Sequence, residues 1–257
     1  MAKILIIPDV HGRTFWKQAY HYVDEVDEVI FLGDYLDPYP FERISNEDTI
    51  ENFKEIIKFK KEHSNVTLLL GNHDLHYLQP FTNEWGCRKI RDHIPEIEGL
   101  FNKNLHHFQI IRIIDNYLFS HAGVLKEWFE VVTDARPMWG SLLYSECKKL
   151  SSTAKQLLDI QLTENHINSL LSHTIGRDAL MMIPRERGGR DKYGSCVWAD
   201  VSELLFYDNK LDFYQIFSHT LIFPDLDTYY KDDRMAMLDC RKCFMLTTET
   251  RELNEMG

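Results

Sequence analysis

Residues that can bind metal ions follow five short apolar runs in this sequence. Each run has the length and composition of a buried strand, and each is followed at once by Asp, Asn or His. In open α/β sheets, ligands collect just beyond the carboxyl ends of the strands, so we expect these side chains to gather on one side of a sheet. In chain order, the motifs are Asp9-x-His11, Gly33-Asp34-x-x-Asp37, Gly71-Asn72-His73-Asp74, His121-Ala122-Gly123 and Ser218-His219-Thr220.

The residue types in these motifs indicate a transition-metal site. Carboxylate, amide oxygen and imidazole together suit Mn, Fe or Zn, whereas a set of oxygen ligands alone would suit Mg or Ca. Asp34 and Asn72 could instead cap helices, and His121 and His219 could be hydrogen-bonded histidines of the core. Because five such motifs occur in one chain, metal ligation is the favoured interpretation.

The elements that must position the first three motifs form a repeated strand–helix pattern. Strands are predicted over Lys3 to Ile7, Val29 to Leu32 and Val66 to Leu70. Apolar residues at helical spacing lie between them, from Phe15 to Val23 and from Ile50 to His63. The order β-α-β-α-β predicts an α/β fold with parallel strands and right-handed crossovers.

The second half of the chain supplies further strands around a long helical stretch. From Leu125 to about Met182 the composition is largely helical, so a single domain over residues 1–257 is predicted, with a helical insertion or cap over 125–185. A hairpin is predicted to turn at Asp115-Asn116. The predicted strands are Phe108 to Ile114, Tyr117 to Phe119, Tyr214 to Phe217, Met235 to Leu238 and Phe244 to Thr247.

Composition excludes several classes of function. The formal net charge is −11, which argues against stable nucleic-acid binding but says little about a phosphorylated substrate at a cation-loaded site. No apolar run approaches the ~20 residues that a membrane helix needs. Five cysteines without a secretory signal favour reduced thiols and a cytoplasmic location. The oligomeric state is left open.

The order and residue types of the motifs resemble the calcineurin-like metallophosphoesterase superfamily, most closely its phosphoprotein-phosphatase-like branch. The resemblance covers the chain from Asp9 to His219. It implies a four-layer αββα sandwich of the metallophosphoesterase type. It also implies a metal-dependent phosphoric ester hydrolase (EC 3.1-type) with two divalent metal ions, for which manganese is favoured over iron and zinc.

The resemblance also implies two sets of metal ligands joined by Asp34. This carboxylate would bridge the ions through its two oxygens, and the second set would need one further histidine. His173, in Ser172-His173-Thr174, is the candidate, because it and His219 flank Arg187-Gly188; the alternative is a histidine on a helix surface. One ion would be bound by Asp9, His11, Asp34 and His219, and the other by Asn72, His121, Asp34 and His173.

Catalytic roles follow from the same resemblance. A hydroxide bridging the ions would attack phosphorus, and His73 would protonate the leaving oxygen as general acid. Asp37 would hold the His73 ring in the required tautomer. Arg187 is the first candidate for binding the phosphoryl oxygens and Arg13 the second, although Arg187 could also be a solvated loop charge.

Two departures bear on the substrate. Protein Ser/Thr phosphatases usually read Gly-Asp-x-x-Asp-Arg-Gly and Gly-Asn-His-Glu, whereas this chain has Pro38 and Asp74 at the Arg and Glu positions. The sequence therefore favours a phosphomonoester or small nucleotide phosphate as substrate over a phosphopeptide. The alternatives are a protein Ser/Thr-type phosphatase and a non-catalytic metal-binding scaffold, for which the His73 and Asp37 pair would be unnecessary.

Overall fold

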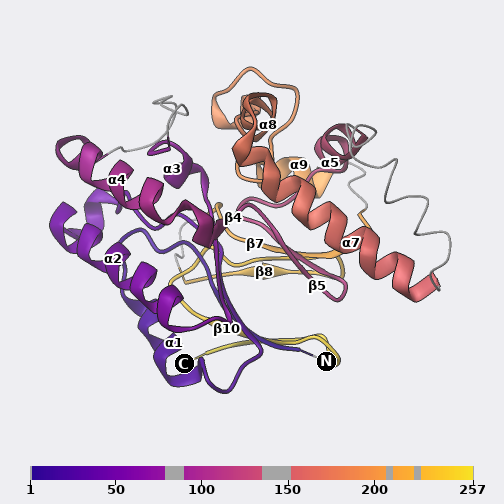
Figure 1. Ribbon diagram of the computed structural model, residues 1–257, viewed down its shortest axis with the longest axis horizontal. Helices are drawn as coiled ribbons and strands as arrows, with labels where there is room; N and C mark the ends of the chain where they lie inside the picture. Colours follow the sequence, from indigo (N-terminus) through magenta and orange to yellow (C-terminus); the bar gives the residue numbers. More distant parts are fainter. Residues whose placement is uncertain (1, 79–89, 135–151, 207–210, 223–226, 257) are drawn as a thin grey trace.

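Two β-sheets packed face to face form the centre of the molecule (Figure 1). The computed structural model describes residues 2–78, 90–134, 152–206, 211–222 and 227–256. The first sheet has the order β11-β10-β1-β2-β3-β4, and the second has the order β5-β6-β7-β9-β8. The strands are β1 (Lys3–Ile7), β2 (Glu28–Phe31), β3 (Val66–Leu69), β4 (Phe108–Gln109), β5 (Arg112–Ile114), β6 (Tyr117–Phe119), β7 (Tyr214–Phe217), β8 (Tyr230–Lys231), β9 (Met235–Met237), β10 (Phe244–Thr247) and β11 (Glu252–Glu255).

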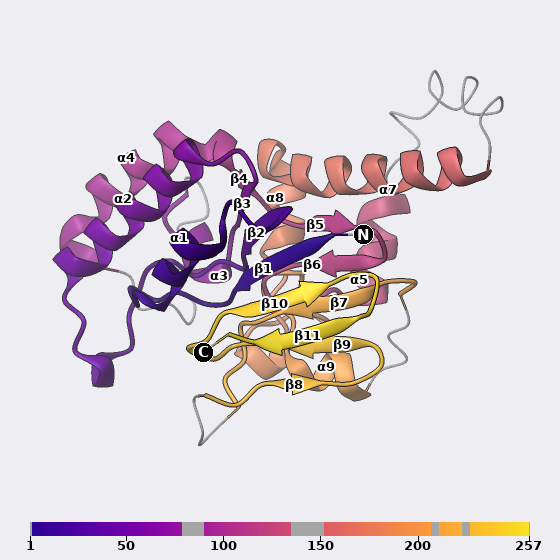
Figure 2. The same cartoon turned by 90° about the horizontal axis from the view of Figure 1, so that it is seen from below.

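Helices form the two outer layers, one against each sheet (Figures 1 and 2). The first sheet is flanked by α1 (Ala19–Tyr22), α2 (Asn46–Glu62) and α4 (Ile94–Asn104). The second sheet is flanked by α5 (Lys126–Asp134), α7 (Ser152–Ser169), α8 (Thr174–Leu180) and α9 (Val201–Phe206). A single helical turn, α3 (Asn72–Leu75), begins directly after β3.

The alternation of side chains along β1 explains this layering. Ile4 and Ile6 lie in the apolar layer between the sheets, together with Phe119 of the second sheet. Leu5 and Ile7 point the other way, into the larger cluster that includes the helices. Because a strand buried on both faces can pack a sheet on one side and helices on the other, the predicted αββα sandwich is confirmed.

The helix α2 forms where its sequence provides a cap and an apolar face. Ser45 precedes it, and the Asp48 N–H donates to the Ser45 Oγ at 3.0 Å. Phe53 and Phe59 on the buried side pack against the first sheet, with ring centroids of Phe59 and Phe31 6.4 Å apart. The helix predicted over Phe15 to Val23 is instead a 3₁₀ turn, Phe15–Gln18, followed by α1.

The prediction of one strand from Phe108 to Ile114 is wrong, because the chain changes sheets within it. Residues 108–109 form β4, which pairs in parallel with β3, whereas residues 112–114 form β5 in the second sheet. The N–H groups of Ile110 and Ile111 between them donate to the Asn168 Oδ1 at 2.8 and 3.0 Å. The predicted hairpin between β5 and β6 is confirmed.

The five motifs predicted to bind metal come from both sheets, so the expectation that they share one sheet is wrong. The first three motifs follow β1, β2 and β3, which are parallel neighbours in the first sheet. The last two follow β6 and β7, which are parallel neighbours in the second sheet. Face-to-face packing of the sheets brings both sets of carboxyl ends together.

Within the described residues, α5, α7 and α8 account for most of the stretch after Leu125 that was predicted to be helical. Residues 135–151 of the predicted insertion lie outside the described part of the chain. A role for the insertion as a cap remains a prediction. In the part of the chain that the structure describes, no helix has the length and apolar character needed to cross a membrane.

Candidate metal centre

The motif side chains converge into two groups of possible metal ligands at the meeting point of the two sheets. Asp9, His11 and Asp34 form the first group, and Asp34, His121 and His219 form the second. Within each group, the ligand atoms all lie within 4.8 Å of one another. Asp34 belongs to both groups and is 2 % exposed, so the convergence lies in the protein interior.

Backbone carbonyl groups hold two of the histidine rings. Nδ1 of His11 lies 2.8 Å from the Leu36 carbonyl oxygen, and Nδ1 of His121 lies 2.9 Å from that of Leu32. Donation from Nδ1–H to a carbonyl oxygen leaves Nε2 unprotonated, as a metal ligand requires. Nε2 of each ring then faces Asp34 Oδ2, at 3.6 Å from His11 and 3.4 Å from His121.

Only one oxygen of Asp34 faces both groups. Its Oδ2 lies near His11 and His121, whereas its Oδ1 accepts the N–H of His73 at 3.0 Å. The sequence-based expectation of a bridge through both carboxylate oxygens therefore does not match this geometry. The arrangement instead offers Oδ2 as the shared ligand atom.

The second group contains His219, which the resemblance had assigned to the first. Its Nδ1 lies 3.0 Å from Nε2 of His121, because the two histidines follow the neighbouring parallel strands β6 and β7. Oδ1 of Asn72 lies 2.9 Å from the same His121 nitrogen. His173 is exposed at the start of α8 and lies in neither group. The second group thus has its second histidine without His173.

The distances and chemistry of these donors fit divalent transition metals. Ligand atoms that each lie about 2.0–2.2 Å from one ion are separated from each other by roughly 3.0–3.6 Å. Within the two groups, the separations of 3.0, 3.4 and 3.6 Å between ligand atoms fall in this range, and the 3.8 Å between Nε2 of His11 and Oδ2 of Asp9 lies just above it. Imidazole and carboxylate donors together are typical of Mn, Fe and Zn sites.

Electrostatics point to the same conclusion. Burial raises the pKa of Asp9 to about 7, and burial followed by the charge of Asp9 raises the pKa of Asp34 well above its usual range. Burial lowers the pKa of His121 to about 3 and that of His219 well below the usual value. Neutral imidazoles beside carboxylates that repel each other form a site whose charge a divalent cation would compensate.

Several site residues adopt left-handed backbone conformations. The φ angles are 45° at His11, 50° at Asp34, 58° at Asp37 and 71° at His219. Such conformations are unfavourable for residues other than glycine and persist where the surroundings determine them. Strained backbone therefore coincides with the residues that the motifs single out.

Gly71 allows the chain to approach Asp34. A Cβ atom at this position would lie 2.1 Å from Asp34 Oδ1 and 2.7 Å from the Asp34 nitrogen. Gly33 has a φ of 110°, and a Cβ there would lie 2.5 Å from the Gly71 nitrogen. Two glycines are thus required for β2 and β3 to end side by side with the shared carboxylate between them.

The carboxylate of Asp74 anchors this turn. It accepts backbone N–H groups from Asp34 at 2.8 Å, Tyr35 at 3.0 Å and Gly71 at 2.9 Å. Asp74 itself is 0 % exposed, so none of these bonds is replaced by solvent in the folded protein. Its position indicates that Asp74 supports the backbone of Asp34.

We therefore predict that Asp74→Ala lowers the free energy of unfolding by about 3 kcal/mol, because buried N–H groups lose their acceptor. Urea denaturation of the chelator-treated protein would measure this. Asp48→Ala, which removes an exposed carboxylate on α2, is the control and should cost less than ~1 kcal/mol. Equal losses for the two variants would contradict the anchoring role.

His73 lies beside both groups with a carboxylate behind it. Its Nδ1 is 2.9 Å from Asp37 Oδ2, and the Tyr77 hydroxyl donates to the other oxygen of Asp37 at 2.5 Å. The rings of His73 and His11 meet edge to face, with centroids 5.1 Å apart. The His73 side chain is 17 % exposed, so part of the ring is accessible to solvent.

Arg13 and Arg187 each contact a turn that carries proposed ligands. Arg13 donates to the Asp9 carbonyl oxygen at 3.2 Å and to Glu42 Oε1 at 2.7 Å. Arg187 donates to the hydroxyl of Thr220, next to His219, and forms an ion pair with Asp200 at 2.8 Å. Both guanidinium groups are thus held close to the two groups of possible metal ligands.

The structure also brings to the site two residues, Ser218 and Asp239, for which the sequence motifs predict no role. The Ser218 hydroxyl donates to Oδ1 of Asp9. Asp239 is 2 % exposed and follows β9, the parallel neighbour of β7. Its signal was present in the sequence, because the predicted strand Met235 to Leu238 runs directly into this Asp, as in the five motifs.

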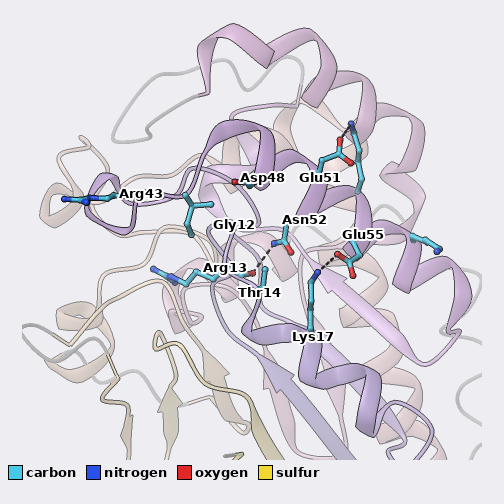
Figure 3. Close-up of a pocket in the computed structure, with 12 residues that line it drawn as sticks. Gly12, Arg13, Thr14, Lys17, Arg43, Asp48, Glu51, Asn52 and Glu55 are labelled. Carbon is cyan, nitrogen blue, oxygen red and sulfur yellow. Dashed lines mark hydrogen bonds and ion pairs between the residues drawn. The ribbon is translucent and has the colours of Figure 1, made fainter.

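Two cavities adjoin the site. The larger, about 890 Å³, lies between the loop after β1 and α2 (Figure 3) and contains none of the proposed metal ligands. Its charged lining is largely ion-paired, with Lys17 2.6 Å from Glu55 and Lys54 2.7 Å from Glu51. The smaller, about 360 Å³, is lined by Asp37, the carboxylate that contacts His73.

Comparisons with known proteins identify the family. The solved structure of a metallophosphoesterase from Sphaerobacter thermophilus is similar at 19 % identity and a TM-score of 0.25, too low to carry an argument; the match spans 48 % of this chain and 47 % of that one. The comparison with curated proteins gives no match. The model of the calcineurin-like phosphoesterases matches residues 2–223, and this chain therefore belongs to the calcineurin-like phosphoesterase family.

Proposed function

We propose that this protein is a dinuclear metal-dependent phosphoesterase that hydrolyses a phosphomonoester or a small nucleotide phosphate. Family membership supplies the coarser part of this statement, a metal-dependent hydrolase acting on phosphoesters. The observation that carries the finer part is the shared Asp34 Oδ2, which faces both groups of ligands. Two groups that share one buried oxygen suit a pair of ions.

Each group would hold one divalent cation. Bound there, the two cations would supply Lewis acidity toward the phosphoryl oxygens and lower the pKa of water. We propose manganese for both positions. The first cation would be held by Asp9, His11 and Asp34, and the second by Asn72, His121, His219 and Asp34.

His73 is proposed as the general acid. It would donate the proton at Nε2 to the oxygen of the departing alcohol, since the contact between Nδ1 and Asp37 orients the ring. Arg187 and Arg13 are proposed to hold the phosphoryl oxygens, because a guanidinium group binds such oxygens in pairs. The His73 and Asp37 pair favours an enzyme over a metal-binding scaffold.

The proposal of a small phosphate ester over a phosphopeptide rests on the loop that follows Asp37. The cavity of about 360 Å³ is lined by Tyr39, Ile44 and Ile90 in addition to Asp37. Tyr39 stacks on Phe41 with ring centroids 5.4 Å apart, and Phe41 is 59 % exposed. A phosphopeptide is the alternative substrate, but Pro38 stands where protein phosphatases carry arginine.

The test is metal removal and restoration. Chelator-treated protein is expected to lose hydrolysis of p-nitrophenyl phosphate, and Mn²⁺ is expected to restore it with about two ions bound per chain. Metal content would be measured by elemental analysis, with bis-p-nitrophenyl phosphate as the diester comparison. Two bound ions without turnover of either ester would favour the scaffold, and failure to bind any metal would overturn the proposal.

A further inference from the structure

The two ligand groups are unequal, and an unassigned carboxylate lies beside the smaller one. Asn72 adds an oxygen to the second group, whereas among the described residues the first consists of Asp9, His11 and Asp34. Asp239 is buried just after β9, which pairs with β7, and Ser218 directly after β7 donates to Asp9 of this group. Burial and then the charge of Asp9 raise the pKa of Asp239 well above its usual range. The charges of Asp9 and Asp239 therefore repel each other in the interior.

Asp239 follows directly after a β-strand, as the residues of the five sequence motifs do. The Leu238 N–H donates to the Phe217 carbonyl oxygen at 2.8 Å, which extends the parallel pairing of β9 with β7 to the residue before Asp239. The Cys240 N–H then donates back to the Leu238 carbonyl oxygen at 2.6 Å, so the chain turns sharply around Asp239. Asp239 thus ends a strand beside the one that delivers His219.

The side chain of Asp239 has no partner that would explain its burial. Its two carboxylate oxygens are buried without a hydrogen-bond partner among the described residues. Arg13 and Arg187 act on its charge only at a distance, since no hydrogen bond or ion pair joins either to Asp239 in the part of the chain described. Burial of a carboxylate without such bonds is costly unless a cation compensates it.

We propose that Asp239 is an outer carboxylate of the metal site, which strengthens binding of the divalent cation held by Asp9, His11 and Asp34. The inference rests on the proposed function. Asp239 lies outside both groups of ligand atoms, so it is a positioning residue that acts through its charge. Replacement of such outer partners typically weakens metal affinity by about 10- to 100-fold.

The test compares Asp239→Asn with the wild-type chain in two measurements. Calorimetric titration of Mn²⁺ into chelator-treated protein is expected to show one of two binding events weakened by about 10-fold or more. The melting temperature of the metal-free variant is expected to rise, because an uncompensated buried carboxylate is removed. If Asp239 had a purely structural role, its replacement would instead lower the melting temperature of the metal-free protein.

Glu164→Gln is the matched control. Glu164 is also buried, but it accepts the Ile113 N–H at 2.6 Å and pairs with Arg112 at 3.0 Å. Its replacement is expected to lower the melting temperature and to leave both Mn²⁺ binding events unchanged. The melting temperature of the metal-free protein should therefore rise in Asp239→Asn and fall in Glu164→Gln. Mn²⁺ affinity should fall only in Asp239→Asn.

Three results would overturn the inference. Unchanged Mn²⁺ affinity in Asp239→Asn would do so. If inhibition by inorganic phosphate changed while the Mn²⁺ affinity did not, Asp239 would act on Arg13 and Arg187 and not on the metal site. A lowered melting temperature of the metal-free variant would make Asp239 structural. If the wild-type chain binds no Mn²⁺, the proposed function fails first and the inference with it.

Discussion

Replacing His73 by alanine is expected to lower turnover by about 10²–10⁴ and to leave both metal ions bound. The imidazole contacts Asp37 through Nδ1 and belongs to neither ligand group, so its removal takes away a proton donor without removing a ligand. Steady-state kinetics and elemental analysis of the same preparation would check both parts. Loss of metal together with turnover would contradict the assignment.

The loss should depend on the leaving group, which distinguishes a general acid from a residue that only shapes the pocket. p-Nitrophenolate leaves readily without a proton, whereas phenolate gains more from protonation. The turnover ratio of wild type to His73→Ala should therefore be larger for phenyl phosphate than for p-nitrophenyl phosphate. Equal ratios for the two esters would count against proton donation.

His173→Ala is the matched control for this experiment. His173 is exposed and lies outside both groups, so its replacement is expected to change neither turnover nor metal content. The same variant tests the sequence-based prediction that His173 is a ligand. A fall of bound metal in His173→Ala would restore that prediction.

Asp34→Asn is expected to reduce metal affinity by at least about 100-fold, more than the loss typical of an outer partner. The asparagine would keep the shape of the residue but remove the charge at Oδ2, which both groups share. The metal-free variant should nevertheless melt at a higher temperature than metal-free wild type, because Asp34 is repelled by Asp9 and Asp74 in the interior. Elemental analysis and calorimetry would measure these effects.

Asp115→Asn is the control for the effect of placing asparagine in a left-handed backbone conformation. Asp115 has a φ of 52°, close to the 50° of Asp34, and its carboxylate accepts the Thr248 hydroxyl at 2.8 Å in the turn between β5 and β6. Asparagine tolerates this left-handed conformation well, so neither variant should fail for backbone reasons. An Asp34→Asn protein that retained two ions at full occupancy would refute the shared-ligand role.

Membership of the phosphoesterase family and the layered fold could both be predicted from the sequence. Strand ends are local features, because an apolar run, a glycine and a polar side chain lie within a few residues of one another. Gly71 illustrates this, because the residue needed for close approach to Asp34 stands directly before Asn72 and His73 in the sequence. The functional roles of the motif residues remain predictions.

The assignment of strands to sheets could not be predicted in the same way. The run from Phe108 to Ile114 looks continuous in sequence. In the structure, Asn168 accepts the N–H groups of Ile110 and Ile111, and the chain crosses to the second sheet at these residues. Asn168 lies 58 residues from Ile110, so this contact exists only after the helix α7 has packed. Long-range contacts of this kind carry no local signal.

The sequence by itself determined which chemical groups stand at the strand ends and in what order. The tertiary structure decided which of them meet: His219 pairs with His121 because β6 and β7 are neighbours, and Asp34 presents one oxygen because the His73 N–H occupies the other. It also placed Asp239 next to the end of β7, through the pairing of β9 with β7. The physical reason is that residue type and turn geometry are local, whereas sheet order depends on contacts between distant parts of the chain.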